Sequence, residues 1–143
     1  MVASFWALLS CGAAVKPVRS TLATAAVALI EVDQLVADRY EAAANTNLAI
    51  AQNLVEYKSL MEKWDKAEEA LRMSRQALLF ADHSVAAFDA GEFEGVHAVA
   101  CALVALEELV PLLEAVNVEV PRAIKDAIKF LRSIQVEACY ERT

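Results

Sequence analysis

The chain of 143 residues carries a formal net charge of −7, and 58% of its residues are apolar. Its three glycines and three prolines are too few for the many turns of an all-β fold. Residues 31–118 hold sixteen acidic side chains against six basic ones. Because nucleic acids and anionic lipid surfaces are bound mainly by clustered lysine and arginine, we expect no nucleic-acid partner.

Residues 1–15 form an apolar N-terminal segment that ends at Lys16. It is shorter than the roughly twenty residues that span a bilayer, but it has the length of the hydrophobic region of a signal peptide. The stretch LLSC at Leu8–Cys11 resembles the lipobox of bacterial lipoproteins. The resemblance implies lipidation of Cys11, loss of residues 1–10 and a place in the cell envelope, in the periplasm or on the face of the outer membrane.

A second interpretation of this segment stays open. No lysine or arginine precedes the apolar run, and Leu9 is bulkier than the residue usual at that position of a lipobox. Residues 2–15 would then be a buried helix or a strand-like lead-in, with Cys11 an ordinary small apolar residue, and the protein would be cytoplasmic or part of a virion. No linker or low-complexity tract divides residues 16–143, which are predicted to form a single helical-bundle domain.

A seven-residue apolar period predicts long amphipathic helices. The ten seam positions, each apolar or aromatic, are Leu22, Leu29, Val36, Ala43, Ile50, Tyr57, Trp64, Leu71, Leu78 and Val85. A single helix over residues 18–89 would be about 107 Å long and would leave this seam uncovered. We therefore expect a hairpin of two helices, at about 19–52 and 54–89, that buries the whole seam.

The hairpin turn is predicted near residue 52. Asn53 and Glu56 have the spacing of a capping box, in which the asparagine accepts from the amide of Glu56 while the glutamate side chain reaches back to the cap. Facing residues of the two helices then have numbers that sum to about 104. This register places Tyr40 opposite Trp64.

A second, shorter hairpin is predicted after the acidic turn between Gly91 and Gly95. Its first helix, about 95–116, contains Pro111, which should kink it or confine the regular part to residues before about 110. A loop follows, and Pro121 should lie in the first turn of the last helix, about 121–139. The predicted fold class is therefore all-α, an antiparallel bundle of a long and a short helical hairpin.

Cys101 and Cys139 are candidates for a disulfide bond. Their numbers are centred on residue 120, the predicted turn of the short hairpin, so they should lie at the same height on adjacent helices. Closing this loop of about 38 residues would stabilise the fold by roughly 3 to 4 kcal/mol. The alternative, in a reducing compartment, is that both thiols are free.

No motif in the chain predicts a metal, a cofactor or catalysis. Glu94 and His97 have the Glu-x-x-His spacing of di-iron bundles, but those sites need a second copy, and we interpret the pair as a solvated cap and a surface histidine. Asp82 and His83 are interpreted as an exposed pair. The charged residues between Glu62 and Arg72 have the alternation typical of a solvated helix face.

Beyond Leu8–Cys11, the alanine-rich helices, the neighbourhoods of Tyr40 and Trp64 and the late cysteine pair resemble small helical lipoproteins of bacteria and their phages. This resemblance implies a location and carries no functional motif. We expect a non-catalytic, exported, lipid-anchored module that binds a protein partner or acts structurally. The alternative is a cytosolic or virion-associated protein that forms a homo-oligomer or binds a partner helix, and a helical metal-binding protein or enzyme is the third.

Overall fold

Four helices make up the residues described by the computed structural model, which are 15–89 and 95–133. Helix α2 spans Val15–Ile50, α3 spans Leu54–Asp89, α4 spans Gly95–Ala115 and α5 spans Arg122–Ser133, and no strand occurs within these ranges. The predicted all-α class and the order of a long and a short hairpin are confirmed. Helix α2 begins one turn earlier than the expected residue 19. The part of the predicted last helix after residue 133 lies outside the described residues.

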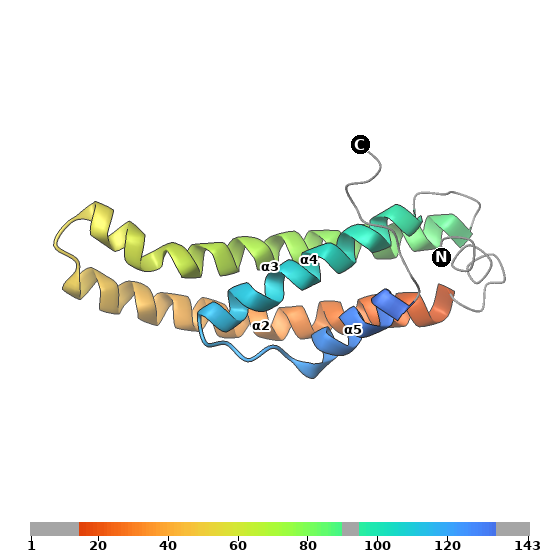
Figure 1. Cartoon of the computed structure of the whole chain (residues 1–143), viewed down its shortest axis with the longest axis horizontal. Coiled ribbons are helices and arrows are strands. Elements are labelled where there is room, and N and C mark those ends of the chain that lie inside the picture. Colours follow the sequence, from red (N-terminus) through yellow and green to blue (C-terminus); the bar gives the residue numbers. More distant parts are fainter. Residues whose placement is uncertain (1–14, 90–94, 134–143) are drawn as a thin grey trace.

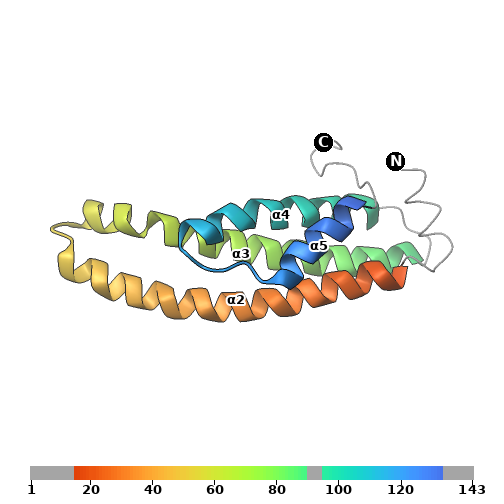
Figure 2. The same cartoon turned by 60° about the horizontal axis from the view of Figure 1, so that its bottom comes forward.

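The helices form two layers of unequal length. Helices α2 and α3 run antiparallel along the whole molecule, while α4 lies beside α3 and α5 beside α2, as Figures 1 and 2 show. The second layer covers only the part of the long hairpin away from its turn. At the other end, on the left of both figures, α2 and α3 project alone as a two-helix arm.

Polar contacts between α2 and α3 fix the register of the long hairpin. They are Tyr40 to Asp65 at 2.7 Å, Arg19 to Asp82 at 2.9 Å and Asp33 to Arg75 at 3.3 Å. The residue numbers in these pairs sum to 105, 101 and 108. The predicted sum of about 104 is therefore confirmed, and Tyr40 reaches the residue next to Trp64.

The hairpin turn is held by the predicted capping residues. The amide of Glu56 donates a hydrogen bond of 2.9 Å to Asn53 Oδ1, which satisfies one of the free amides at the start of α3. The Glu56 carboxylate accepts from the amide of Gln52 at 3.2 Å, one residue before the expected Asn53. The side chains that end α2 and begin α3 thus close the turn in three residues.

Burial along the heptad seam falls off toward the turn. Leu22, Leu29, Val36 and their counterparts on α3, Leu71, Leu78 and Val85, are fully buried in the core. Tyr57 and Trp64 are half-buried, and Ile50 is 60% exposed. The expectation of a seam buried throughout is therefore wrong at Ile50, because α4 and α5 end before they reach that part of the hairpin.

Helix α4 continues through Pro111 to Ala115, so its regular part is not confined to residues before about 110 as expected. Pro111 lies on the exposed side of the helix. The turn that follows the helix contains Asn117, whose φ is 59°. The amide of Val118 donates to the Leu113 carbonyl at 3.0 Å and that of Asn117 to the Glu114 carbonyl at 3.0 Å, which is the Schellman pattern.

The loop after α4 is tied to the long hairpin. Arg39 Nη1 on α2 donates a hydrogen bond of 2.9 Å to the Asn117 carbonyl oxygen. Pro121 then precedes α5 and its carbonyl accepts from the amide of Ile124 at 3.0 Å, so this proline is the N-cap and not a residue of the first turn. Ile124, Ala127, Ile128 and Leu131 turn the apolar face of α5 into the core.

Candidate functional site

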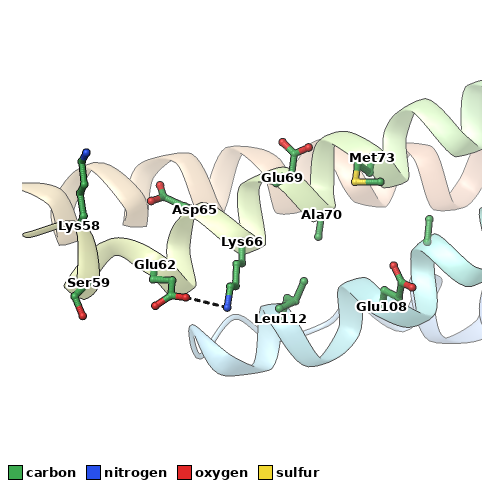
Figure 3. A pocket seen from close by; sticks show the side chains of 11 residues that line it. Lys58, Ser59, Glu62, Asp65, Lys66, Glu69, Ala70, Met73, Glu108 and Leu112 are labelled. Atoms are coloured by element: carbon green, nitrogen blue, oxygen red, sulfur yellow. Dashed lines mark ion pairs between the residues drawn. The ribbon is translucent and has the colours of Figure 1, made fainter. Parts of the chain in front are cut away.

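A groove of about 610 Å³ lies between α3 and α4. This volume is in the range of pockets that take a small organic ligand or a few side chains of a partner. Figure 3 shows the groove with α3 on one side and α4 on the other. Its lining residues are Lys58, Ser59, Glu62, Asp65, Lys66, Glu69, Ala70, Met73, Ala105, Glu108 and Leu112.

The floor of the groove is apolar. It is formed by Ala70 and Met73 from α3 and by Ala105 and Leu112 from α4. Met73 is 53% exposed, so its side chain is accessible to a ligand in the groove. Methionine is flexible and polarisable, so it can adapt to ligands of different shape.

A buried serine holds the two walls together. The Ser74 hydroxyl, next to Met73 on α3, is fully buried and donates a hydrogen bond of 3.3 Å to the carbonyl of Ala105 on α4. Because Ala70 and Ala105 carry only a methyl group, the space above them stays open although the helices are in contact. The floor of the groove therefore lies where α3 packs on α4, and Lys58, Ser59 and Glu62 extend its rim toward the hairpin turn.

Charged side chains surround this apolar floor. Four carboxylates, Glu62, Asp65, Glu69 and Glu108, face two ammonium groups, Lys58 and Lys66, so that the lining has a net charge of −2. Lys66 pairs with Glu62 at 3.1 Å, as the dashed line in Figure 3 marks, and Glu69 pairs with Arg72. The rim therefore attracts cationic groups that flank an apolar ligand.

One rim residue also belongs to the hairpin contact. Asp65 accepts the hydrogen bond from Tyr40, and this bond, with burial and the negative charge of Asp65, raises the pKa of Tyr40 to about 12. On the same side of α3, burial and the neighbouring charges of Asp33 and Asp65 raise the pKa of Glu68. The hydrogen bond to Asp65 is the main cause for Tyr40, whereas burial is the main cause for Glu68, with the nearby carboxylates adding to both.

Sequence reasoning did not find the groove. Its prediction that Glu62, Lys66 and Glu69 lie on a solvated face is confirmed, since all three are exposed, but it did not show that the same side chains form the rim of a groove. The usable signal was the small residue Ala70 three positions before Met73, since such spacing puts a gap beside a large apolar side chain on one helix face. The groove also requires the small side chain of Ala105, which lies on another helix. Its position opposite Ala70 could be known only from the packing of α3 on α4.

The cysteine predictions are only partly within the described residues. Cys101, half-buried on α4, is disulfide-bonded. Cys139, its predicted partner, and Cys11, the predicted lipidation site, both lie outside the described residues. The pairing of Cys101 with Cys139 and the modification of Cys11 therefore stay predictions.

The histidine pairs do not assemble a metal site in the part of the chain that the structure describes. Asp82 is engaged by Arg19, and His83 is exposed beside it. Glu94 and the side chain of His97 lie outside the described residues. Across residues 15–89 and 95–133, no group of three or more histidine, cysteine or acidic side chains is placed to hold a metal ion.

Two further hollows are smaller. One of about 430 Å³ lies between α2 and α5 and includes Thr21, Thr24 and Arg122, and one of about 320 Å³ lies between α4 and α5 beside Pro111. Two of the three hydroxyls in the first are used within α2, where Thr21 donates to the Pro17 carbonyl and Thr24 to that of Ser20. These two hollows therefore have less volume than the α3–α4 groove, and the first has few hydroxyl groups available to bind a ligand.

By length and composition alone, the stretch Pro17–Ile50 of α2 is apolar enough to cross a membrane. Its most apolar line, which includes Leu22, Leu29 and Val36, packs into the bundle core, as in a core helix of a folded domain. One third (33%) of its apolar window is buried in the bundle. Comparison of the chain with protein-family models, with curated proteins and with solved structures finds no match.

Proposed function

We propose that this protein is a non-catalytic binding module, exported and anchored through its N-terminal segment, that holds a segment of a partner protein in the α3–α4 groove. The observation that carries the proposal is the open apolar floor of Ala70, Met73, Ala105 and Leu112 within a rigid bundle. Rigid walls reduce the conformational entropy lost on binding, so even a small groove can retain a ligand.

The rim determines which partner fits best. An excess of two carboxylates over ammonium groups favours a segment with apolar residues on one face and lysine or arginine beside them. An amphipathic helix presents this combination with the spacing that a groove between two helices accepts. The partner expected is therefore a basic amphipathic helix.

The lining of the groove supports binding over catalysis. Its polar groups are carboxylates, two lysines and the hydroxyl of Ser59, and its lining contains neither histidine nor cysteine. A nucleophile needs a base within hydrogen-bond reach, and a general acid or base needs a pKa shifted toward neutrality. The one lining residue with a shifted pKa is Glu69, whose pKa is lowered by Arg72, away from neutrality.

Site-specific photo-crosslinking tests the proposal. A photoreactive residue placed at Met73, in the groove, is expected to give a defined adduct with one partner protein in cells. The control position is Leu79, which is 68% exposed on the same helix but outside the groove, and it should give none.

A variant with a filled groove provides the second test. Ala105→Phe should close the floor and abolish the adduct, while Ala123→Phe, in the α2–α5 hollow, should leave it unchanged. Equal adducts from Met73 and Leu79, or an adduct that persists in Ala105→Phe, would contradict binding in this groove. Circular dichroism of both phenylalanine variants checks that the bundle is intact.

A further inference from the structure

The two-helix arm, residues 40–64, carries an uncovered continuation of the bundle core. Its seam positions Ala43, Ile50, Tyr57 and Trp64 follow in register from residues that are fully buried in the covered part. Leu60 belongs to the companion stripe of Ala67, Ser74 and Ala81, which are all 0% exposed, yet it is 39% exposed. We refer to the surface formed by these five residues of the arm as the distal face.

We propose that the distal face binds the distal face of a second copy of this chain, with the two hairpins antiparallel. In the covered part, the same seam is occupied by one layer of two helices, α4 and α5. The arm of a second copy is also one layer of two helices with an apolar seam. The arm of the second copy can therefore cover the distal face as α4 and α5 cover the rest of the hairpin. The two arms together form a four-helix bundle.

The position of the two-fold axis follows from the length of the arm. The cover ends where Arg39 binds the Asn117 carbonyl, and the turn lies at residues 51–53. This leaves about 13 residues of α2, or about 20 Å. Two antiparallel arms overlap fully when the axis crosses the middle of this stretch, between residues 45 and 46 of α2, and the 105 register of the hairpin places residues 59 and 60 of α3 opposite that point.

Charges on α3 are complementary in this arrangement. When α3 lies antiparallel on α3 of the second copy with the axis between residues 59 and 60, facing residues have numbers that sum to 119. Leu60 then faces Ser59 of the second copy, so that the two Leu60 side chains lie next to each other on either side of the axis. Glu56 faces Lys63 of the second copy, with the same pair repeated across the axis. Both side chains are exposed in the single chain, and the Glu56 carboxylate, which accepts from the Gln52 amide through one oxygen, has its second oxygen for Lys63 of the other copy.

The size of the contact predicts its strength. A face about 20 Å long and two helices, or about 20 Å, wide gives about 400 Å² on each copy. The total of about 800 Å² is below the 1,200 Å² of stable complexes, so the dimer is weak and reversible. We expect a dissociation constant near the micromolar range or weaker, so that the dimer forms where the local concentration is high.

Sedimentation equilibrium of the full chain, from about 1 µM to about 1 mM, tests the proposal. The wild type should change from monomer to dimer over this range. Leu60→Lys should raise the dissociation constant at least about tenfold, because it places two ammonium groups next to each other at the axis. Leu79→Lys, at a more exposed leucine outside the distal face, should dimerise like the wild type.

A charge exchange tests the orientation. Lys63→Glu should weaken the dimer, since it places Glu56 opposite a second carboxylate, and adding Glu56→Lys should restore at least part of the affinity. Circular dichroism must show all variants folded, which exposure of the four positions predicts. A wild type that stays monomeric throughout, a Leu60→Lys protein that dimerises normally, equal loss in Leu79→Lys, or no rescue by the exchange would each overturn the proposal.

Discussion

The hydroxyl of Tyr40 on α2 donates a hydrogen bond of 2.7 Å to Asp65 Oδ1 on α3, at the boundary between the covered part of the hairpin and its arm. The bond fixes the register of the two longest helices. It also joins the hairpin to the groove, because Asp65 lies on the groove rim.

The Tyr40–Asp65 bond predicts a shifted tyrosine titration. Its donor is the neutral phenol, and the pKa of Tyr40 is raised from 10.0 to about 12. The bond should therefore contribute its full stability below pH 10, and this contribution should be lost as the pH rises through 12. Asp65→Asn should return the pKa of Tyr40 toward 10, measured by phenolate absorbance, and an unchanged titration curve would show that the bond does not form in solution.

Asn117 is predicted to matter because of its backbone and not its side chain. At a φ of 59°, most residues with a Cβ lose about 1 to 2 kcal/mol, which asparagine partly avoids and glycine avoids entirely. Asn117→Ala should lower the free energy of unfolding by about 1 kcal/mol, and Asn117→Gly should not. Urea denaturation measures both, with Asn45→Ala on the exposed part of α2 near its C-terminal end as the control, and equal effects of alanine and glycine at 117 would contradict this account.

The core and the surface of α3 should respond differently to the same truncation. Leu71 is fully buried, so Leu71→Ala should cost about 2 to 5 kcal/mol of unfolding free energy through lost burial and a cavity. Leu79→Ala, at 68% exposure on the same helix, should stay within about 0.5 kcal/mol. Thermal and urea unfolding distinguish the two, and similar losses would mean that the seam does not face the core.

Removal of Pro111 should stabilise α4. A proline within a helix removes one amide bond and crowds the carbonyl four residues earlier, here that of Glu107. Pro111→Ala should therefore raise the free energy of unfolding by about 1 kcal/mol or more. Pro121→Ala, at the N-cap of α5 where no amide bond is lost, is the matched control and should give no gain; a loss of stability in Pro111→Ala would contradict the prediction.

The disulfide bond and the lipidation predicted for the three cysteines can be tested together. Peptide mapping without reduction should find Cys101 bonded to Cys139, and the intact mass of protein made in bacteria should show loss of residues 1–10 and a lipid adduct on Cys11. The disulfide of Cys101 is present in the structure, while its partner is the quantity tested. A bond between Cys101 and Cys11 would contradict both predictions at once, since a lipidated thiol cannot pair.

The helices could be predicted from the sequence because their signals are local. The heptad seam from Leu22 to Val85, the capping pair Asn53 and Glu56 and the loop from Asn117 each act within a few residues of the chain. From them follow the hairpin, its turn and its register, all of which the structure confirms.

What the sequence could not supply is how far one helix covers another. The seam is equally apolar at Leu29 and Ile50, but Ile50 is exposed because α4 stops at Ala115 and its loop is held by Arg39. The groove has the same origin, since Ala70 and Ala105 open a space only where two distant segments meet. Both features depend on contacts between helices, which a periodic pattern on one helix does not encode.

The unequal length of the two layers has a consequence for how the molecule opens. Amides of α2 and α3 beneath the second layer can exchange with solvent only when most of the bundle unfolds. Those near Ile50 and Leu54 need only local fraying of the two helix ends at the turn. Deuterium uptake should thus fall steadily from the turn toward the core of the bundle. A partner that binds the arm would slow deuterium uptake most at the amides of the arm, where uptake is fastest. Uptake by these amides therefore measures binding to the arm.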